Sequence, residues 1–394
     1  GYFDLYDIKG IGPMTHGQKS QPNTLISTEI AQQITAAIVQ NIPNLESSIA
    51  KCFGKYFPVL PSYIKAKNYR LNQHLLGINK NPIIEKPLNL IVYGAPGTGK
   101  SYILNEDVKA HFPDDELRTR ITFHPNYSYR NFIGSYKPKP IYTNTEKTIF
   151  ESDRITEHPF QKEPIIEYSF EAGPLLKMFV KAFHNPKHNF VIVIEEINRA
   201  NTAAVFGDVF QLLDRKNGVS EYPITLEPAA YDYLKNNNID KNEFKLPANL
   251  YLWATMNNAD QGVMPMDSAF KRRWSFQYMA LNANEDEVKD ETIKFPWGFE
   301  IKWNLFRKKI NEELVSHNIA EDKLVGPFFL NKDELKSSDA ILNKLLLYLS
   351  EDVLKYTEGI FHSELKTFSQ IVSNYTLDVP KNVFNDELGF SNPK

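Results

Sequence analysis

The sequence predicts an α/β fold in which a parallel sheet is followed by a helical domain. Three short apolar runs, Leu88 to Tyr93, Phe190 to Ile194 and Leu250 to Thr255, are separated by stretches of helical character. Continuous apolar runs of this length are typical of strands that are buried on both faces of a parallel sheet. From about residue 281 onward the chain is predicted to be mainly helical, and the clearest helix runs from Ile341 to Tyr356 with an apolar stripe.

The 394 residues divide into three predicted parts. Residues 1–87 are turn-rich, hold one helical stretch from Thr28 to Ile42, and are predicted to form a small, mostly helical N-terminal region. Residues 88–280 carry the alternating strands and helices, and residues 281–394 form the helical C-terminal domain. The chain begins at Gly1 rather than Met, which favours a trimmed or tagged chain, so residues 1–87 could be the remnant or linker of a further N-terminal specificity domain.

The composition excludes several classes of protein. The hydrophobic share of 42% and the charged share of 24% are ordinary for a protein with a buried core. The net charge of −3 does not indicate a nucleic-acid or membrane partner, so any DNA contact must come from a local patch or from another subunit. One cysteine, Cys52, excludes a disulfide within the chain. No apolar run is long enough to cross a bilayer, and we expect a cytoplasmic protein without membrane contact.

Residues Gly94 to Ser101 match the full Gly-x4-Gly-Lys-Ser/Thr pattern between a predicted strand and a predicted helix. The glycines let the backbone wrap closely around phosphate, and the amides at the helix start point at the β-phosphate. Lys100 places a positive charge between the β- and γ-phosphates, and the Ser101 hydroxyl can bind Mg²⁺. The predicted nucleotide-binding residues are Gly94, Ala95, Pro96, Gly97, Thr98, Gly99, Lys100, Ser101 and Tyr102.

Two acidic residues, Glu195 and Glu196, directly follow the second apolar run. A buried strand that ends in two acids can aim them at a metal ion and at the γ-phosphate. Glu195 is predicted to hold Mg²⁺ together with Ser101, and Glu196 is predicted to orient or deprotonate the attacking water. The metal-side acid is usually Asp, so Glu195 is one methylene longer.

Polar side chains also follow the third apolar run. Asn257 is predicted to hydrogen-bond the attacking water or the γ-phosphate. Farther along, Arg272 and Arg273 lie in a basic turn. An NTPase that forms a ring needs a cation delivered to the γ-phosphate of the neighbouring subunit, and the planar guanidinium binds phosphate oxygens bidentately. Both arginines are therefore candidates for that role.

Taken in order, these segments resemble the McrB branch of the AAA+ nucleoside triphosphatases. The resemblance covers residues 88–280 well and the C-terminal helices more loosely. The matching stretches are Phe123 to Ile133, Glu195 to Asn201 (a Glu-Glu-Ile-Asn-Arg-Ala-Asn sequence), Val205 to Asp208, Met256 to Asp260 (Met-Asn-Asn-Ala-Asp) and Lys271 to Phe276.

The resemblance implies an αβα nucleotide domain with a helical lid, and hexameric rings that hold GTP or ATP between subunits. It implies that hydrolysis drives DNA translocation, that a separate McrC-like partner carries the nuclease, and that an N-terminal domain reads modified DNA. By residue match, Asn257 resembles the first sensor and Asp260 resembles the signature acid close to the subunit interface. Arg272 and Arg273 match the arginines that act on the neighbouring subunit.

This sequence also departs from the pattern of that branch. Glu195 replaces Asp, and Gln261-Gly262 replaces the usual Arg-Ser after the signature acid. No arginine of the C-terminal domain is a clear second sensor, although the segment from Val325 to Phe329 lies near the place where one is expected. No DNA-reading domain is recognisable in residues 1–87.

Two further patterns favour structural roles. The Glu-x-Lys tripeptides at Glu334 to Lys336 and Glu364 to Lys366 could belong to a nuclease, but both are predicted to lie in helices without a partner Asp. The aromatic run around Tyr127, Tyr129, Phe132 and Tyr136 could stack nucleic-acid bases, but packing in the core or at a subunit contact is the favoured interpretation.

The leading hypothesis is a Mg²⁺-dependent GTPase or ATPase that powers DNA translocation in a restriction or anti-phage complex acting on modified or phage DNA. One alternative is a remodelling or scaffold ATPase that holds a partner protein and does not translocate DNA. Another is a ring that binds nucleotide for assembly but hydrolyses it poorly because of Glu195. The phosphate loop contacts only phosphates, so the sequence does not distinguish GTP from ATP.

Overall fold

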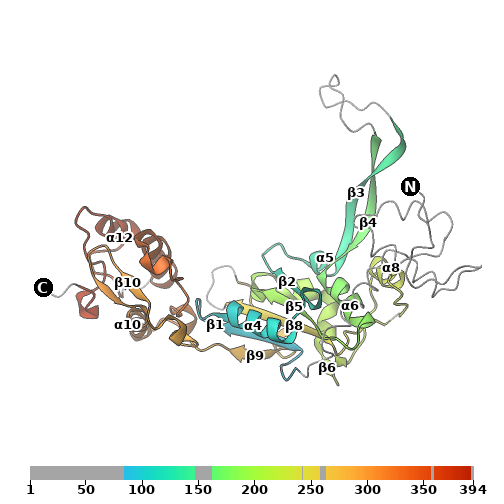
Figure 1. The fold of residues 1–394 in the computed structure, drawn as a ribbon, viewed down its shortest axis with the longest axis horizontal. Helices are drawn as coiled ribbons and strands as arrows, with labels where there is room; N and C mark the ends of the chain where they lie inside the picture. Colours follow the sequence, from blue (N-terminus) through green and yellow to red (C-terminus); the bar gives the residue numbers. More distant parts are fainter. Residues whose placement is uncertain (1–83, 147–161, 242, 258–262, 356–358, 392–394) are drawn as a thin grey trace, which may run out of the picture.

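The computed structural model describes residues 84–146, 162–241, 243–257, 263–355 and 359–391. The predicted helix from Thr28 to Ile42 and most of the predicted N-terminal region lie outside these residues. Figure 1 shows a central sheet with helices packed around it, a long hairpin that projects from one side, and a C-terminal part at the other end.

The central sheet has five parallel strands in the order β2-β5-β8-β1-β9, which confirms the predicted α/β fold (Figure 1). The three predicted apolar runs are the inner strands β1, β5 and β8, and nearly all their side chains are buried. The edge strands β2 and β9 are half-exposed, so no continuous apolar run predicts them. The strand bounds are β1 Asn89–Gly94, β2 Arg118–Thr122, β5 Phe190–Glu195, β8 Leu250–Asn257 and β9 Ser275–Tyr278.

Helices of different lengths connect these strands. The helix α6 begins with Pro174 at its first position, where the missing N–H has no helical partner to lose, and it buries one apolar face against β5. The helix bounds in this part are α4 Lys100–His111, α5 Tyr129–Phe132, α6 Pro174–His184, α7 Thr202–Phe206, α8 Pro228–Asn236 and α9 Ser268–Lys271; a small hairpin joins β6 Arg215–Lys216 to β7 Val219–Ser220.

A two-stranded antiparallel ribbon, β3 (Gly134–Glu146) and β4 (Lys162–Ala172), projects away from the sheet (Figure 1). Alternate residues of each strand share a face, and the register places eight apolar residues on one of them. We call this the apolar hairpin face: Tyr136, Pro138, Pro140 and Tyr142 from β3, and Pro164, Ile166, Tyr168 and Phe170 from β4. The opposite face carries charged residues, among them the ion pair of Lys137 with Glu171.

The C-terminal part has a second core of buried side chains, separate from the core around the sheet. The prediction of a mainly helical region is confirmed, and residues 292–302 add a small antiparallel hairpin that the sequence analysis did not predict. The buried stripe predicted after Ile341 is confirmed as far as Val353, but π-helical segments replace most of the predicted α-helix. The bounds are β10 Thr292–Lys294, β11 Glu300–Lys302, α10 Trp303–Ser316, α11 Ser338–Ala340, the π-helical segments Ile341–Leu346 and Tyr348–Val353, and α12 Phe368–Tyr375.

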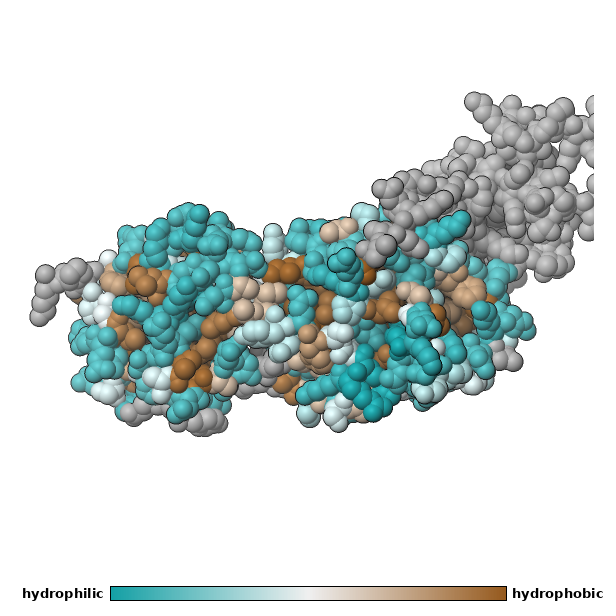
Figure 2. All heavy atoms as spheres, turned by 90° about the horizontal axis from the view of Figure 1, so that it is seen from below, coloured by the Kyte–Doolittle hydropathy of each residue, from teal (hydrophilic) through white to brown (hydrophobic). Residues whose placement is uncertain are grey.

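The prediction that both Glu-x-Lys tripeptides lie in helices is wrong for the second one. Glu334–Lys336 forms a short 3-10 helix, whereas residues 364–366 precede α12. Figure 2 shows that hydrophilic side chains cover most of one face of the molecule, with hydrophobic patches among them. Across the parts of the chain that the structure describes, no helix combines the length and apolarity needed to cross a membrane.

Candidate functional site

The predicted phosphate loop connects β1 to α4, as the sequence motif requires. Gly97 and Gly99 adopt φ values of +71° and +85°, a left-handed conformation that favours glycine. The buried Thr98 closes the turn, because its hydroxyl donates a hydrogen bond of 2.9 Å to the Ala95 carbonyl oxygen. The loop therefore has the backbone needed to direct successive amides at an anion.

The Lys100 ammonium lies inside this loop. It is buried, and its Nζ donates to the carbonyl oxygens of Gly94 at 3.0 Å and Ala95 at 2.7 Å. The charge is thus held where the motif places it, next to the predicted position of the phosphates. Tyr102, one residue beyond Ser101, is more than half exposed on the first turn of α4.

The structure brings Ser101 and Glu195 together. The Ser101 hydroxyl donates a 2.8 Å hydrogen bond to Glu195 Oε2, across 94 residues of sequence. This hydroxyl–carboxylate pair is a donor set that suits Mg²⁺, which favours oxygen ligands. Arg120 on β2 forms an ion pair with the same carboxylate and also donates to Asn105 Oδ1 at 2.9 Å. The extra methylene of Glu195 therefore does not keep its carboxylate away from the phosphate loop.

Thr255 on β8 is a site residue that the sequence did not single out. Its hydroxyl donates to Glu195 Oε2 at 2.5 Å and accepts a hydrogen bond from the backbone N–H of Glu196 at 3.1 Å. One side chain thus fixes both carboxylate-bearing residues. The only sequence signal is a hydroxyl at the end of an otherwise apolar run, and that pattern alone does not indicate a function.

Replacing Thr255 with Val is expected to lower turnover about tenfold and to raise the Mg²⁺ concentration needed for half-maximal turnover. Valine has nearly the same shape but leaves the Glu196 N–H without its partner, at a cost of about 1–3 kcal/mol. The check is NTP hydrolysis titrated with Mg²⁺. Thr122→Val is the matched control, because Thr122 is exposed and pairs in register with Glu195. Equal titration curves for both variants would show that the Thr255 contacts are unused.

Glu196 follows β5 in a left-handed conformation, with φ at +54°, which few residues other than glycine adopt. Its carboxylate forms an ion pair with Arg199, three residues along the chain. Such a conformation persists only where its surroundings hold it, and such positions cluster at functional sites. Arg199 therefore sets the direction of the carboxylate that is predicted to activate water.

Asn257 lies beside the phosphate loop, because β8 pairs with β1 in a register that places Asn257 next to Gly94. Asn198 Nδ2 donates a 2.6 Å hydrogen bond to the Asn257 carbonyl oxygen, and Asn198 O accepts a 2.7 Å bond from the Met264 N–H. These contacts tie the end of β8 to the segment after Glu196. The role of Asn257 as a sensor stays a prediction, and Asp260 lies outside the described residues.

The two candidate arginines have different environments. The Arg273 side chain is 8% exposed, forms an ion pair with Asp214 at 2.7 Å, donates to the Ala269 carbonyl oxygen at 2.8 Å, and packs over the Phe210 ring. Arg272 is exposed and lines a cavity of about 730 Å³. The predicted role for Arg273 on a neighbouring subunit conflicts with this buried network, whereas Arg272 is free of that constraint.

The strand pairing places this turn relative to the sheet. Arg272 precedes β9, and β9 runs parallel to β1 with Ser275 beside Leu90. The backbone of the turn therefore lies near the amino-terminal ends of the strands, and the cavity that Arg272 lines is also lined by Tyr93 and Met256 from the carboxyl-terminal ends of β1 and β8.

Most of the predicted aromatic run packs internally. Phe132 is fully buried, Tyr127 stacks on Phe123, and Tyr129 lies against Gly207. Burial raises the pKa of both Tyr127 and Tyr129 to about 12. Only Tyr136 is exposed, as part of the apolar hairpin face.

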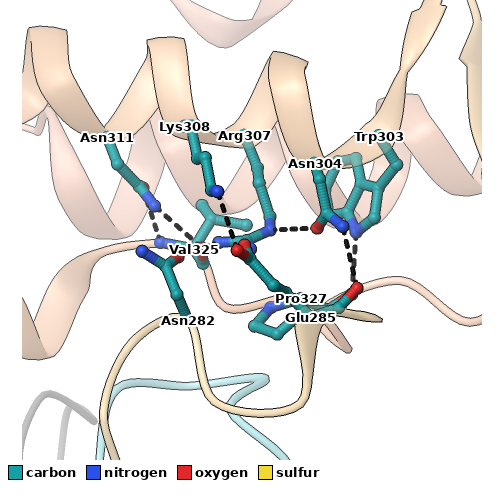
Figure 3. A network of polar contacts seen from close by, with 9 residues as sticks. All are labelled: Asn282, Glu285, Trp303, Asn304, Arg307, Lys308, Asn311, Val325 and Pro327. Carbon is teal, nitrogen blue, oxygen red and sulfur yellow. Dashed lines mark hydrogen bonds and ion pairs between the residues drawn. The ribbon is translucent and has the colours of Figure 1, made fainter. Parts of the chain in front are cut away.

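The C-terminal domain contains a single arginine, Arg307. It is fully buried and donates to Asn304, Asn282 and Glu285 (Figure 3). Desolvation lowers its pKa, and the Glu285 charge opposes that shift. Arg307 therefore joins α10 to the segment after β9 and is not available as a second sensor.

A phosphate loop, a strand-end pair of carboxylates and an asparagine on the strand between them, all at one end of a five-stranded parallel sheet, define a P-loop nucleoside triphosphatase of the AAA type. The family model described as "AAA domain (dynein-related subfamily)" matches residues 89–274. The chain belongs to the McrB-like AAA+ nucleoside triphosphatases, as comparison with two curated proteins shows.

The chain is 47% identical over 309 residues to the Type II restriction enzyme BsuMI component YdiS of Bacillus subtilis, which covers 77% of this chain and 89% of that protein. It is 27% identical over 282 residues to the Type IV methyl-directed restriction enzyme EcoKMcrB subunit of Escherichia coli. That match covers 68% of this chain and 53% of that protein.

Proposed function

We propose that this NTPase is the ring-forming motor subunit of a restriction system, in which hydrolysis of GTP or ATP powers translocation along modified or phage DNA. The observation that carries the proposal is the Ser101–Glu195–Thr255 contact, which assembles a hydrolytic site from three distant segments. The names of the two relatives, a component and a subunit of restriction enzymes, support the biological setting.

Each residue has one role in the proposed reaction. Lys100 and the loop amides bind the phosphates, and Ser101 and Glu195 would hold Mg²⁺, which supplies charge neutralisation of the phosphate oxygens. Glu196 accepts the proton of the attacking water, and Asn257 orients that water. Arg272 of the adjacent subunit reaches the γ-phosphate, so each site is completed only in the ring.

We also propose that residues 281–394 form a lid domain. Its support is the separate core between Val288 and Phe390. Residues 1–87 as a distinct N-terminal region stay a prediction.

Hydrolysis should be measured with the chain alone, with DNA, and with DNA plus a McrC-like nuclease. The motor proposal expects DNA and the partner to stimulate turnover. Turnover that neither of them changes would favour the remodelling or scaffold alternative.

The apolar hairpin face has the properties of a docking site for a protein partner. Tyr136, Ile166 and Tyr168 on it are each more than 60% exposed. Exposed apolar side chains that lie next to one another on a surface mark interaction sites. Proline lacks an N–H, so Pro138 and Pro140 disfavour addition of another strand along β3 and leave the face itself as the contact. We assign this face to the McrC-like subunit.

Replacing Ile166 with Glu is expected to weaken binding of the McrC-like subunit at least about tenfold, because the variant buries a charge in the contact. Ile165→Glu is the matched control, since Ile165 is similarly exposed but lies on the opposite face of the ribbon. Co-elution and titration with the partner measure the effect, and the mass of the ring should not change. Equal binding by both variants would exclude this face as the docking site.

A further inference from the structure

The segment Val325 to Phe329 of the C-terminal domain lies directly on the phosphate loop. The Gly326 N–H donates to the Pro96 carbonyl oxygen at 3.0 Å, and the Phe328 N–H donates to the Gly97 carbonyl oxygen at 2.7 Å. The backbones touch, since a Cβ on Gly326 would lie 2.4 Å from the Gly97 carbonyl carbon. A Cβ on Gly97 would lie 2.5 Å from the Phe329 nitrogen, so both glycines are needed for this approach.

Buried side chains of α10 hold this segment in place by hydrogen bonds to its backbone. Trp303 Nε1 donates to the Pro327 carbonyl oxygen at 2.7 Å, and Asn311 both donates to Val325 O at 2.9 Å and accepts from Val325 N–H at 2.8 Å (Figure 3). Arg307 on the same helix binds Asn282 and Glu285. The segment that contacts the phosphate loop is therefore itself held in position by α10.

The two accepting carbonyls belong to peptide units that form the phosphate cradle. The peptide that carries the Pro96 carbonyl also carries the Gly97 N–H, and the peptide that carries the Gly97 carbonyl also carries the Thr98 N–H. Hydrogen bonds in series polarise one another, so donation to a carbonyl strengthens the N–H of the same peptide as a donor. The segment also fixes the left-handed turn at Gly97.

We propose that Val325 to Phe329 is a positioning element of the nucleotide site, which holds the phosphate loop in its anion-binding conformation through the Gly326 and Phe328 amides. This role belongs to the backbone and needs no arginine, which accounts for a C-terminal domain whose single arginine is buried elsewhere. Because coupling between two sites is reciprocal, nucleotide binding must in turn favour docking of this segment.

The first test replaces Gly326 with Ala in the full chain. The φ of Gly326 is outside the left-handed range, so the added Cβ acts by its collision with the peptide between Gly97 and Thr98. The dissociation constant for a non-hydrolysable GTP or ATP analogue is expected to rise about tenfold to a hundredfold. The control is Gly359→Ala in the same domain, where the nearest atoms to a Cβ are side-chain atoms, the Leu354 methyl carbons at 3.1 and 3.5 Å and His317 Cγ at 4.0 Å.

The second test needs no variant. In the unaltered protein, the same analogue is expected to slow hydrogen exchange of the Gly326 and Phe328 amides relative to the nucleotide-free protein. The proposal is overturned if Gly326→Ala binds as tightly as the unaltered protein, if Gly359→Ala weakens binding equally, or if nucleotide leaves the exchange of both amides unchanged. The proposal on Val325 to Phe329 rests only on nucleotide binding by the phosphate loop. A protein whose turnover DNA does not stimulate would contradict the motor proposal but not this one.

Discussion

Replacing Glu196 with Gln is expected to leave nucleotide binding intact and to reduce turnover by about 100-fold to 10,000-fold. Glutamine keeps the shape and the acceptor oxygen of the side chain, but its amide cannot take a proton from water. The backbone should not change, because the Glu196 N–H still donates to Thr255 and glutamine is no less suited than glutamate to the left-handed conformation. Binding of a fluorescent GTP or ATP analogue and release of phosphate measure the two effects separately.

The control for this variant is Glu312→Gln, the same chemical change at an exposed position of α10. It should hydrolyse nucleotide like the unaltered protein. Turnover by Glu196→Gln above about a tenth of the normal rate would show that another group activates the water. Loss of nucleotide binding would instead show that Glu196 supports the loop rather than the reaction.

Replacing Arg272 with Ala is expected to lower turnover of the assembled ring about 1,000-fold or more, in the range that arginines supplied by a neighbouring subunit contribute to phosphoryl transfer. The thermal unfolding midpoint of Arg272→Ala should equal that of the unaltered protein, because the Arg272 side chain is exposed. Arg273→Ala should behave differently. It leaves Asp214 without its partner and uncovers the Phe210 ring, so we expect a midpoint lower by several degrees.

Mixed rings distinguish action in trans from action within one subunit. Arg272→Ala and Glu196→Gln are each expected to be nearly inactive alone. If Arg272 acts in trans, a mixed ring contains interfaces in which an intact Glu196 of one subunit faces an intact Arg272 of the next, so mixing should restore part of the turnover. If mixing restores none while the rings still assemble, the assignment of Arg272 to the neighbouring site is wrong.

The sequence was sufficient where function depends on a short local pattern. The phosphate loop has its glycines, lysine and serine within eight consecutive positions, and its flanking strand and helix are evident from apolar spacing. The paired acids at the end of β5 are equally local. The buried inner strands can be predicted from the sequence because they are apolar on both faces. The polar edge strand β2 and the projecting hairpin resemble loops in sequence.

Tertiary structure decided what depends on contacts between distant segments. Arg272 and Arg273 are the same residue type side by side, and only the packing of Asp214 and Phe210 shows that one of them is fixed within its own subunit. Thr255 acquires its role because parallel pairing places β8 beside β5. The sequence by itself determined a phosphate-binding hydrolase. The contact of Val325 to Phe329 with the phosphate loop came only from the fold, because backbone amides make its hydrogen bonds and no side-chain pattern in the sequence marks them.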